Sequence, residues 1–360
     1  MLDRNFWLGK RVFITGHTGF KGSWLCLWLH KLGADVHGYS LPPPTEPSLY
    51  NDAGIADLVQ STIADVRDAS SLSRALAQCA PEIVIHMAAQ SLVRASYEIP
   101  IETFSTNVLG TAQLLDSLRS VSTVRAVVAV TSDKCYHNEE WVWGYRENAR
   151  LGGHDPYSAS KACAELVVDA FRHSFYRAAE GQAFAAIASA RAGNVIGGGD
   201  WARDRLIPDV LRSLLKSQTT LIRNPQATRP WQHVLEPLHG YLMLAERLYQ
   251  GGGGQYQSAW NFGPDETSEK TVGWITDRLY ELWQVDFLWT KDVNPGPSEN
   301  TFLKLDAAKA RAHLGWSPKL DLDTTLQWIV RWTKSYARGA NSRDITLADI
   351  DAFMAIGPRS

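Results

Sequence analysis

The sequence predicts an α/β fold built on a doubly wound parallel sheet, with a smaller C-terminal substrate lobe. Three observations support this fold class. Short apolar, β-branched runs alternate with amphipathic stretches through the first half of the 360-residue chain, which is the pattern of successive βαβ units. A glycine-rich turn directly follows the first run. After about residue 191 the loops become rich in Gly, Pro and Trp, and the helical stretches lie further apart.

The expected elements follow in order along the chain. The first unit is a strand at 10–15, the glycine turn, a helix at 23–32 that Gly33 ends, and a strand at 34–39. Later strands are expected at 60–64, 82–86, 126–131 and 184–190, and helices at 70–78, 103–118 and 157–178. Pro156 suits the first turn of the last of these helices. The C-terminal part should hold helices at 208–215, 236–249, 271–283, 306–314 and 324–337.

The change in loop composition and helix spacing after about residue 191 predicts the domain organisation. Residues 1–190 are expected to form a Rossmann-type dinucleotide-binding domain, to which segments at about 230–262 return. Residues 191–360 should mainly form a lobe that covers the substrate. The run of four glycines at 251–254 is expected to be a flexible loop, and it is not a cofactor site because no strand precedes it. The stretch after about residue 339 is expected to be a loosely attached tail or an oligomer contact.

Composition and charge exclude several classes of function. The net charge is −2 and the isoelectric point is near 6.6, so no general basic field attracts nucleic acid or an anionic membrane. The first residues lack the pattern of a signal peptide, and the apolar run at 23–29 is too short to span a bilayer. The four cysteines are scattered without metal-ligand spacing. We therefore expect a cytoplasmic protein with buried thiols and no metal.

The glycine turn predicts a dinucleotide site. A pyrophosphate binds where a strand turns into a helix, because free backbone N–H groups and the helix dipole converge there. The expected contacts in this turn are Gly16, His17, Thr18, Gly19, Phe20, Lys21 and Gly22. Ser40 stands where a carboxylate would bind the ribose of NAD, while His17 and Lys21 could reach a 2′-phosphate. On the residues alone, the choice between NAD and NADP stays open.

Tyr157 and Lys161 are expected to start the chemistry. Residues four apart lie on one face of a helix, roughly 6 Å apart. An ammonium held there favours the phenolate and so lowers a tyrosine pKa that is ordinarily about 10. A tyrosine that ionises near neutral pH can remove a proton from a sugar hydroxyl while hydride leaves the same carbon. Together with the glycine turn, this pair predicts nicotinamide-dependent oxidation.

The order of the motifs resembles that of the extended short-chain dehydrogenase/reductase family along nearly the whole chain. The motifs are Gly-His-Thr-Gly-Phe-Lys-Gly at 16–22, His-Met-Ala-Ala at 86–89, Asn107, Ser-Asp-Lys at 132–134, Tyr157 with Lys161, Arg-Ala-Gly-Asn at 191–194, Arg-Pro-Trp at 229–231 and Asn-Phe-Gly at 261–263. Within the family, Ser-Asp-Lys and the glycine turn look most like those of the dehydratases that act on CDP-glucose. The resemblance implies NAD as cofactor and a nucleotide sugar as substrate.

The resemblance also implies a role for each site residue. Ser132 would bind the 4-oxygen of the sugar, Asp133 would act as the acid that expels the 6-hydroxyl, and Lys134, if neutral, would be the base at C5. Further cofactor contacts would come from Asp65, Val66, Ala88, Ala89 and Asn107. The nucleotide-sugar contacts would come from Arg191, Asn194, Arg203, Arg229 and Glu299. Helices 103–118 and 157–178 would pair with their copies in a homodimer or homotetramer.

Two alternatives remain open on the sequence. A nucleotide-sugar 4-epimerase or reductase needs Tyr157 and Lys161 but not Asp133 and Lys134. A non-catalytic dinucleotide sensor needs none of these four side chains.

His86 at a strand end is more simply a hydrogen-bonded core histidine than a catalytic one, and Trp201 is equally suited to the core and to packing over a base.

Overall fold

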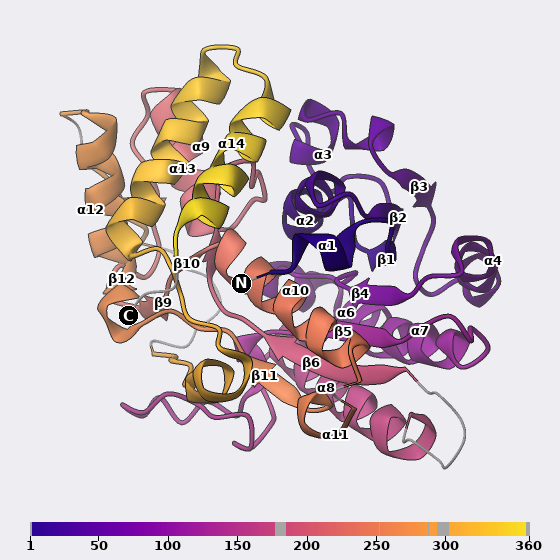
Figure 1. Ribbon diagram of the computed structural model, residues 1–360. Helices are drawn as coiled ribbons and strands as arrows, with labels where there is room; N and C mark the ends of the chain where they lie inside the picture. Colours follow the sequence, from indigo (N-terminus) through magenta and orange to yellow (C-terminus); the bar gives the residue numbers. More distant parts are fainter. Residues whose placement is uncertain (1, 177–184, 252, 287, 294–301, 358–360) are drawn as a thin grey trace.

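The central sheet has seven strands, and every pairing within it is parallel. The computed structural model describes residues 2–176, 185–251, 253–286, 288–293 and 302–357. The strand order is β11-β6-β5-β4-β1-β2-β3 (Figure 1). These strands are β1 Arg11–Thr15, β2 Asp35–Ser40, β3 Gln60–Ile63, β4 Ile83–His86, β5 Ala126–Val130, β6 Ala186–Arg191 and β11 Ala259–Asn261.

Helices cover both faces of this sheet, which confirms the predicted fold class. Val12 and Ile14 of β1 belong to one apolar core, with Trp24 and Leu238 from the helices above them. Phe13, between them, belongs to a second core on the opposite face. The first face carries α2 Phe20–Lys31, α10 Leu235–Tyr249 and α14 Ser342–Ala355; the second carries α4 Ala69–Cys79, α7 Gly110–Leu118 and α8 Pro156–Phe175.

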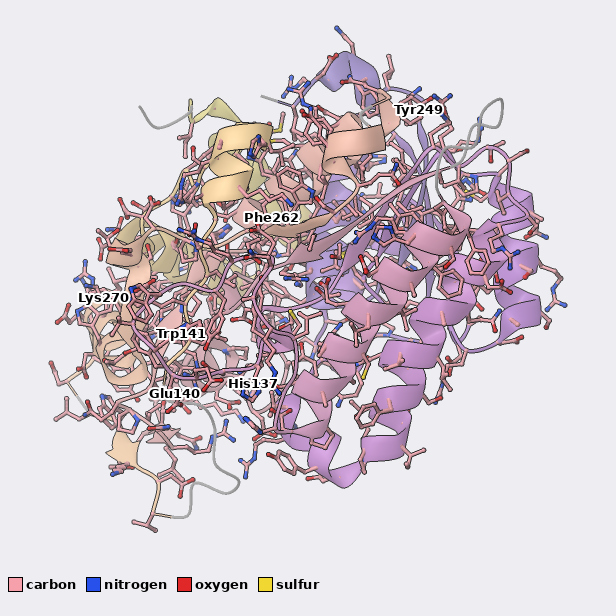
Figure 2. The ribbon with its side chains drawn as sticks, turned by 90° about the horizontal axis from the view of Figure 1, so that it is seen from below. His137, Glu140, Trp141, Tyr249, Phe262 and Lys270 are labelled. Atoms are coloured by element: carbon pink, nitrogen blue, oxygen red, sulfur yellow. The ribbon has the colours of Figure 1, made fainter. Side chains whose placement is uncertain are left out.

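The predicted helix at 103–118 is one continuous helix with an irregular middle turn. It begins as α6 Pro100–Phe104, widens into a π-helical turn, η2 Ser105–Leu109, and continues as α7. The widened turn places Asn107 in the interior, where it is 1% exposed. Such π-turns are frequent at functional sites. This helix lies beside α8, and the two stand together on one side of the molecule in Figure 2.

Smaller elements complete the chain. The short helices are α1 Arg4–Trp7, α3 Leu49–Asp52, α5 Val93–Glu98 and α11 Gly253–Tyr256, with 3-10 turns η1 Ile55–Asp57, η3 Asp133–Cys135 and η4 Glu266–Ser268. The C-terminal half adds helices α9 Leu206–Leu215, α12 Val272–Trp283 and α13 Leu322–Ala337, and a π-turn η5 Ala310–Leu314. Its paired strands are β7 Val195–Ile196 with β10 Gln232–His233, β8 Leu221–Ile222 with β13 Thr290–Lys291, and β9 Thr228–Pro230 with β12 Glu269–Thr271.

The C-terminal half has its own apolar core, built from α9, α12 and α13. However, α10 packs on the main sheet and β11 pairs with its strand β6. The division into two domains at about residue 190 stays a prediction. Among the described residues, no helix combines the length and hydropathy that a membrane span requires.

Two expectations about the C-terminal half are wrong. The stretch after residue 339 is not a loose tail, because α14 packs on α2 and its Ile350 and Phe353 are fully buried. The ring of Phe353 meets the edge of Trp28 at 5.7 Å between centroids. The glycine run at 251–254 is not a plain loop either, since α11 begins at Gly253.

Candidate active site

The glycine turn has the geometry that a bound phosphate requires. Gly16 has a φ of +79°, and a Cβ there would lie 2.7 Å from the backbone N of Ala88. A Cβ on Gly22 would lie 2.2 Å from the carbonyl oxygen of Gly16. Helix α2 begins after Gly19 without a side-chain cap. The backbone N–H groups of its first turn therefore suit an anion, and the turn fits the pyrophosphate of a dinucleotide.

The end of β2 brings two predicted cofactor residues together. The Thr18 hydroxyl oxygen lies 3.0 Å from that of Ser40 and donates to the carbonyl of Leu41 at 2.8 Å. His17 turns the other way, into the core, where its Nε2 lies 2.6 Å from the hydroxyl of Ser61. Burial lowers the pKa of His17 to about 4. A neutral, buried imidazole gives no support to a 2′-phosphate site.

Lys21 also lies away from the place expected for a 2′-phosphate. Its ammonium is 6.0 Å from the ring of Tyr241 on α10. Burial, followed by the charges of Lys161 and Arg205, lowers the pKa of Lys21 to about 7, and Asp133 opposes that shift. These neighbours place Lys21 on the catalytic side of the glycine turn. The alternative of an NADP site held by His17 and Lys21 therefore loses its support.

The remaining cofactor candidates line the edge of the sheet. The Asp65 carboxylate binds the Arg67 guanidinium at 2.5 Å and stays partly exposed. Val66 is buried against Gly110, where a Cβ would lie 2.7 Å from its side chain. The backbone N–H of Ala88 donates to Thr15 at 3.1 Å, which holds Ala88 and Ala89 next to the glycine turn.

Helix α8 carries Tyr157 and Lys161 at a well-defined start. Pro156 occupies the first turn, and the Asp155 carboxylate caps the helix by accepting from the Ser158 backbone at 2.9 Å. The backbone N–H of Tyr157 donates to the Ser96 hydroxyl at 3.2 Å. Tyr157 and Lys161 are 7% and 6% exposed. The predicted pair is therefore buried one helical turn apart.

Asn107 holds this helix against the neighbouring loop. Its amide nitrogen donates to the Ser160 hydroxyl at 2.8 Å and to the carbonyl of Gln90 at 3.0 Å. Its amide oxygen accepts from the backbone of Gln90 at 2.8 Å. The π-turn aims this side chain inward, so Asn107 bonds the backbone near the catalytic helix. His86 is a satisfied core residue, as expected, bonded to Thr15 and Thr111.

The expected low pKa of Tyr157 is wrong. Burial raises the pKa of Tyr157 to about 12, and a hydrogen bond with Ser132 and the charge of Arg205 oppose this rise. Burial also lowers the pKa of Lys161 to about 8. Desolvation disfavours both charged forms, and one helical turn of separation does not outweigh it.

Ser132 and Asp133 lie beside Tyr157 at the end of β5. The Ser132 hydroxyl donates to the Asp133 carboxylate at 3.0 Å and accepts from the backbone of Lys134 at 3.2 Å. Asp133 is 1% exposed, and its Oδ2 has no hydrogen-bond partner among the described residues. A Cβ on Gly193 would lie 1.9 Å from this Oδ2, so only glycine leaves it room. Asp133 opposes the ionisation of Tyr157, which places the two groups in one centre.

Sequence reasoning missed two further residues of this centre. Tyr241 of α10 is fully buried, and its hydroxyl has no hydrogen-bond partner in the part of the chain described. Burial raises the pKa of Tyr241, and the nearby Asp133 and Tyr157 add to this rise. The charge of Arg205, the residue directly before α9, opposes the rise that burial causes in the pKa of Tyr157. The same charge adds to the fall that burial causes in the pKa of Lys21. No motif marked either residue; only the contact between distant segments reveals them.

Arg191 does not lie where a substrate phosphate could reach it. Its guanidinium is 3% exposed and binds the Glu165 carboxylate at 2.8 Å. It also donates to the Tyr136 hydroxyl at 2.8 Å and to the carbonyl of Glu147 at 3.0 Å. The predicted role in substrate binding is therefore wrong, because this guanidinium is part of a buried ion pair that joins β6 to α8.

The other predicted substrate residues are spread more widely. Arg203 is exposed, whereas Arg205, two residues further on, is partly buried and binds the Asp200 carboxylate. Asn194 has a φ of +41° and follows Gly193 directly. Arg229 is 5% exposed and donates to the carbonyl of Thr228 at 3.1 Å. Glu299 lies outside the described residues.

The buried ion pair gives a stability prediction. Glu165→Ala is expected to lower the free energy of unfolding by about 3–5 kcal/mol, because Arg191 is left with an uncompensated buried charge. Urea unfolding followed by circular dichroism measures this change. Asp169→Ala, which breaks an exposed pair with Arg172 on the same helix, should cost no more than about 1 kcal/mol. Equal losses in the two variants would contradict the structural role of Glu165.

Comparisons with known proteins place this geometry in a family. The family model for GDP-mannose 4,6 dehydratase matches residues 13–329. The CDP-glucose 4,6-dehydratase of Salmonella typhimurium is 54% identical over 360 residues, which is 100% of both chains. The structure of a dTDP-glucose 4,6-dehydratase from Streptomyces venezuelae with NAD and TYD bound is similar in fold. It has a TM-score of 0.76 and 24% identity, and covers 92% of this chain and 99% of that chain.

An epimerase shares the fold as well. The UDP-glucuronic acid 4-epimerase from Bacillus cereus, in complex with UDP-glucuronic acid and NAD, has a TM-score of 0.77 at 20% identity, and covers 90% of this chain and 99% of that chain. At this identity the likeness concerns the fold alone. The family model and the full-length relative show the family as well as the fold. They agree with the motifs of the short-chain dehydrogenases/reductases. The chain therefore belongs to the family that the GDP-mannose 4,6 dehydratase model describes.

Proposed function

We propose that this chain is a CDP-glucose 4,6-dehydratase, a hydro-lyase that converts CDP-D-glucose to CDP-4-keto-6-deoxy-D-glucose and water. The observation that carries the proposal is the full-length relative of that name, at 54% identity without a gap in coverage. The grouping of Ser132, Asp133 and Tyr157 at one end of the sheet supports it. A dehydratase needs an acid that expels the 6-hydroxyl beside the base that removes the proton of the 4-hydroxyl.

NAD is the proposed cofactor. The uncapped first turn of α2 and the close glycines of its loop would hold the pyrophosphate. Thr18 and Ser40 would lie toward the adenosine ribose, and Asp65 toward the adenine. When bound, NAD supplies an acceptor for hydride from C4 of the sugar and a donor that returns it to C6.

Tyr157 and Ser132 would act at C4. The neutral phenol dominates in the chain itself, so Tyr157 would act through its deprotonated fraction, which accepts the proton of the 4-hydroxyl, while Ser132 donates a hydrogen bond to the 4-oxygen. Lys161, one turn further along the helix, contributes positive charge while it is protonated. These side chains are almost fully buried, so their electrostatic interactions are stronger than they would be in water.

Asp133 and Lys134 would complete the elimination. The ketone at C4 makes the C5 proton acidic, and Lys134 in its neutral form removes it. Asp133 donates a proton to the departing 6-hydroxyl, which leaves as water. The Oδ2 of Asp133, which has no partner among the described residues, is the oxygen we assign to this step. Arg229 remains a candidate for the diphosphate, Asn194 for the nucleotide, and Glu299 for the sugar or its diphosphate.

A direct assay tests this function. The purified chain is incubated with NAD and CDP-glucose, and the 4-keto product is detected by its absorbance in alkali, with GDP-mannose and dTDP-glucose as comparison substrates. CDP-glucose is expected to give the strongest signal. A 4-epimerised hexose without the chromophore would instead indicate an epimerase, and no change with any of the sugars would refute both functions.

The oligomer is proposed to be built on α8 and the neighbouring continuous helix from α6 to α7. Their outward faces carry Ile101, Leu109 and Leu166, which are 80%, 64% and 58% exposed. A groove of about 450 Å³, lined by Leu109 and Phe171 among others, lies between these helices and away from the catalytic residues. Apolar side chains of this size on adjacent helices suit a four-helix interface with a second copy of the chain.

The double variant Leu109→Glu and Leu166→Glu should weaken this dimer. Four like charges brought together in a two-fold interface disfavour association, while each monomer keeps its core. Sedimentation velocity should show dimers or larger species for the wild type and monomers for the variant. Leu221→Glu, 65% exposed on β8, is the matched control. A monomeric wild type would refute the interface.

A further inference from the structure

Glu165 lies on the same face of α8 as the catalytic pair. Tyr157, Lys161 and Glu165 follow one another at intervals of four residues, so their side chains project from one side of the helix. All three are buried, with exposed fractions of 7%, 6% and 3%. The helix packs on β6 and on the turn η3, which begins at Asp133. Glu165 therefore belongs to the buried contact between the catalytic helix and the strand ends.

The Glu165 carboxylate binds the ends of two neighbouring strands. Its Oε1 accepts a hydrogen bond from the hydroxyl of Thr131, the residue that directly follows β5. Its Oε2 accepts from the Ser189 hydroxyl at 2.7 Å and from the Arg191 guanidinium at 2.8 Å, and both of these residues belong to β6. Strand β6 is thus held by two side chains, whereas in the part of the chain described Thr131 alone ties β5 to this carboxylate.

The Glu165 carboxylate keeps its charge in this buried place. Burial by itself would raise the pKa of Glu165, but the charge of Arg191 and the three hydrogen bonds hold that pKa below its ordinary value. An ionised carboxylate can only accept hydrogen bonds, so the Thr131 hydroxyl donates to it. Hydrogen bonds to a charged group are stronger than those between neutral groups, so this contact resists displacement.

Thr131 stands directly before the residues assigned to the elimination. The Ser132 hydroxyl, next along the chain, donates to the Asp133 carboxylate at 3.0 Å. The backbone N–H of Thr131 donates to the carbonyl of Ala190 at 2.9 Å, which joins the ends of β5 and β6. The place of Ser132 and Asp133 relative to Tyr157 therefore depends on how firmly these strand ends are held against α8.

We propose that Thr131 is a positioning residue, whose hydrogen bond to Glu165 fixes the end of β5 against α8. The end of β5 leads into Ser132 and Asp133, and α8 carries Tyr157. This inference rests on the proposed function, in which these groups must act on one sugar in turn. A misplacement of about 1 Å between groups that act together can cost about a hundredfold in rate, so a hydroxyl that touches no reacting atom can still govern turnover.

Thr131→Val tests this role, because it replaces the hydroxyl with a methyl group of similar size. The kcat with CDP-glucose is expected to fall by about tenfold to a hundredfold, while the KM for CDP-glucose stays close to that of the wild type. Thr131→Ser, which keeps the hydroxyl, should recover most of the rate. Ser189→Ala is the matched control: it removes the other hydroxyl from the same carboxylate, leaves Arg191 to hold β6, and should keep its kcat.

Urea unfolding separates positioning from stability, because Thr131→Val and Ser189→Ala each remove one hydrogen bond from Glu165. Similar losses of stability, with a loss of kcat confined to Thr131→Val, support the proposal. An equal kcat in the two variants, or a loss that Thr131→Ser does not recover, would overturn it. If Thr131→Val does not fold, Thr131→Ala takes its place in each comparison.

A second measurement needs no turnover. Crystal structures of the NAD-loaded wild type and variants give the separation between the Ser132 hydroxyl oxygen and the Tyr157 hydroxyl oxygen. A separation that changes in Thr131→Val and not in Ser189→Ala supports the proposal. An unchanged separation in Thr131→Val contradicts it, even where the wild type proves inactive with CDP-glucose.

Discussion

Tyr157→Phe is expected to lower kcat with CDP-glucose by about a hundredfold to ten-thousandfold, the usual range for loss of a general base. The substitution removes one hydroxyl from a side chain that is 7% exposed, so the ring still fills its place in α8. Binding of CDP-glucose and of NAD, measured by calorimetry, should change little. The loss should therefore appear in kcat rather than in the dissociation constants.

Tyr176→Phe is the matched control for this variant. Tyr176 follows the same helix and is also buried, but its hydroxyl donates to the carbonyl of Leu115, far from the proposed chemistry. It should lose some stability and keep its turnover. A Tyr157→Phe enzyme that retains more than a tenth of the wild-type rate would rule out Tyr157 as the base.

Asp133→Asn is expected to separate oxidation from elimination. Tyr157 and Ser132 remain, so C4 can still be oxidised and the near-ultraviolet absorbance of NADH should appear. An amide cannot donate the proton that the departing 6-hydroxyl needs, so formation of the 4-keto-6-deoxy product should fall by about a hundredfold or more. Stopped-flow absorbance should show NADH accumulating to a lasting level instead of passing through a brief maximum.

The control for this variant is Asp169→Asn, an exposed carboxylate on α8. It should match the wild type both in the appearance of NADH and in the formation of the 4-keto-6-deoxy product. If Asp133→Asn binds both ligands and yields no NADH, then Asp133 is needed for the oxidation itself, and the assignment of steps to residues is wrong.

Patterns within short segments of the sequence were sufficient to predict most of the strands and helices. The strands β1, β4 and β5 are short apolar runs buried on both faces, and such runs can pack only in the middle of a covered parallel sheet. The glycine turn and the Tyr157–Lys161 spacing likewise depend on residues close in sequence. Helix α14 was missed because its 14 residues show little amphipathic contrast, although Ile350 and Phe353 fill the core beside Trp28.

The errors in the candidate site have a common physical cause. Arg191 and Arg205 cannot be told apart by residue type, and only the fold shows that Arg191 is buried in an ion pair with Glu165 while Arg205 stays partly exposed and binds Asp200. Likewise, Lys21 was placed with the ribose because it belongs to the glycine turn, although its first helical turn directs it toward Tyr241. Burial, which decides the pKa of Tyr157, is also a property of the assembled fold.

The most direct test of the proposed reaction follows the hydride. CDP-glucose labelled with deuterium at C4 is converted in the presence of unlabelled NAD, and the product is examined by NMR. Internal transfer predicts that the deuterium is found at C6 of the 4-keto-6-deoxy sugar, while the recovered cofactor is unlabelled. Deuterium retained at C4 of a recovered hexose, or accumulated on the nicotinamide, would contradict an internal dehydration.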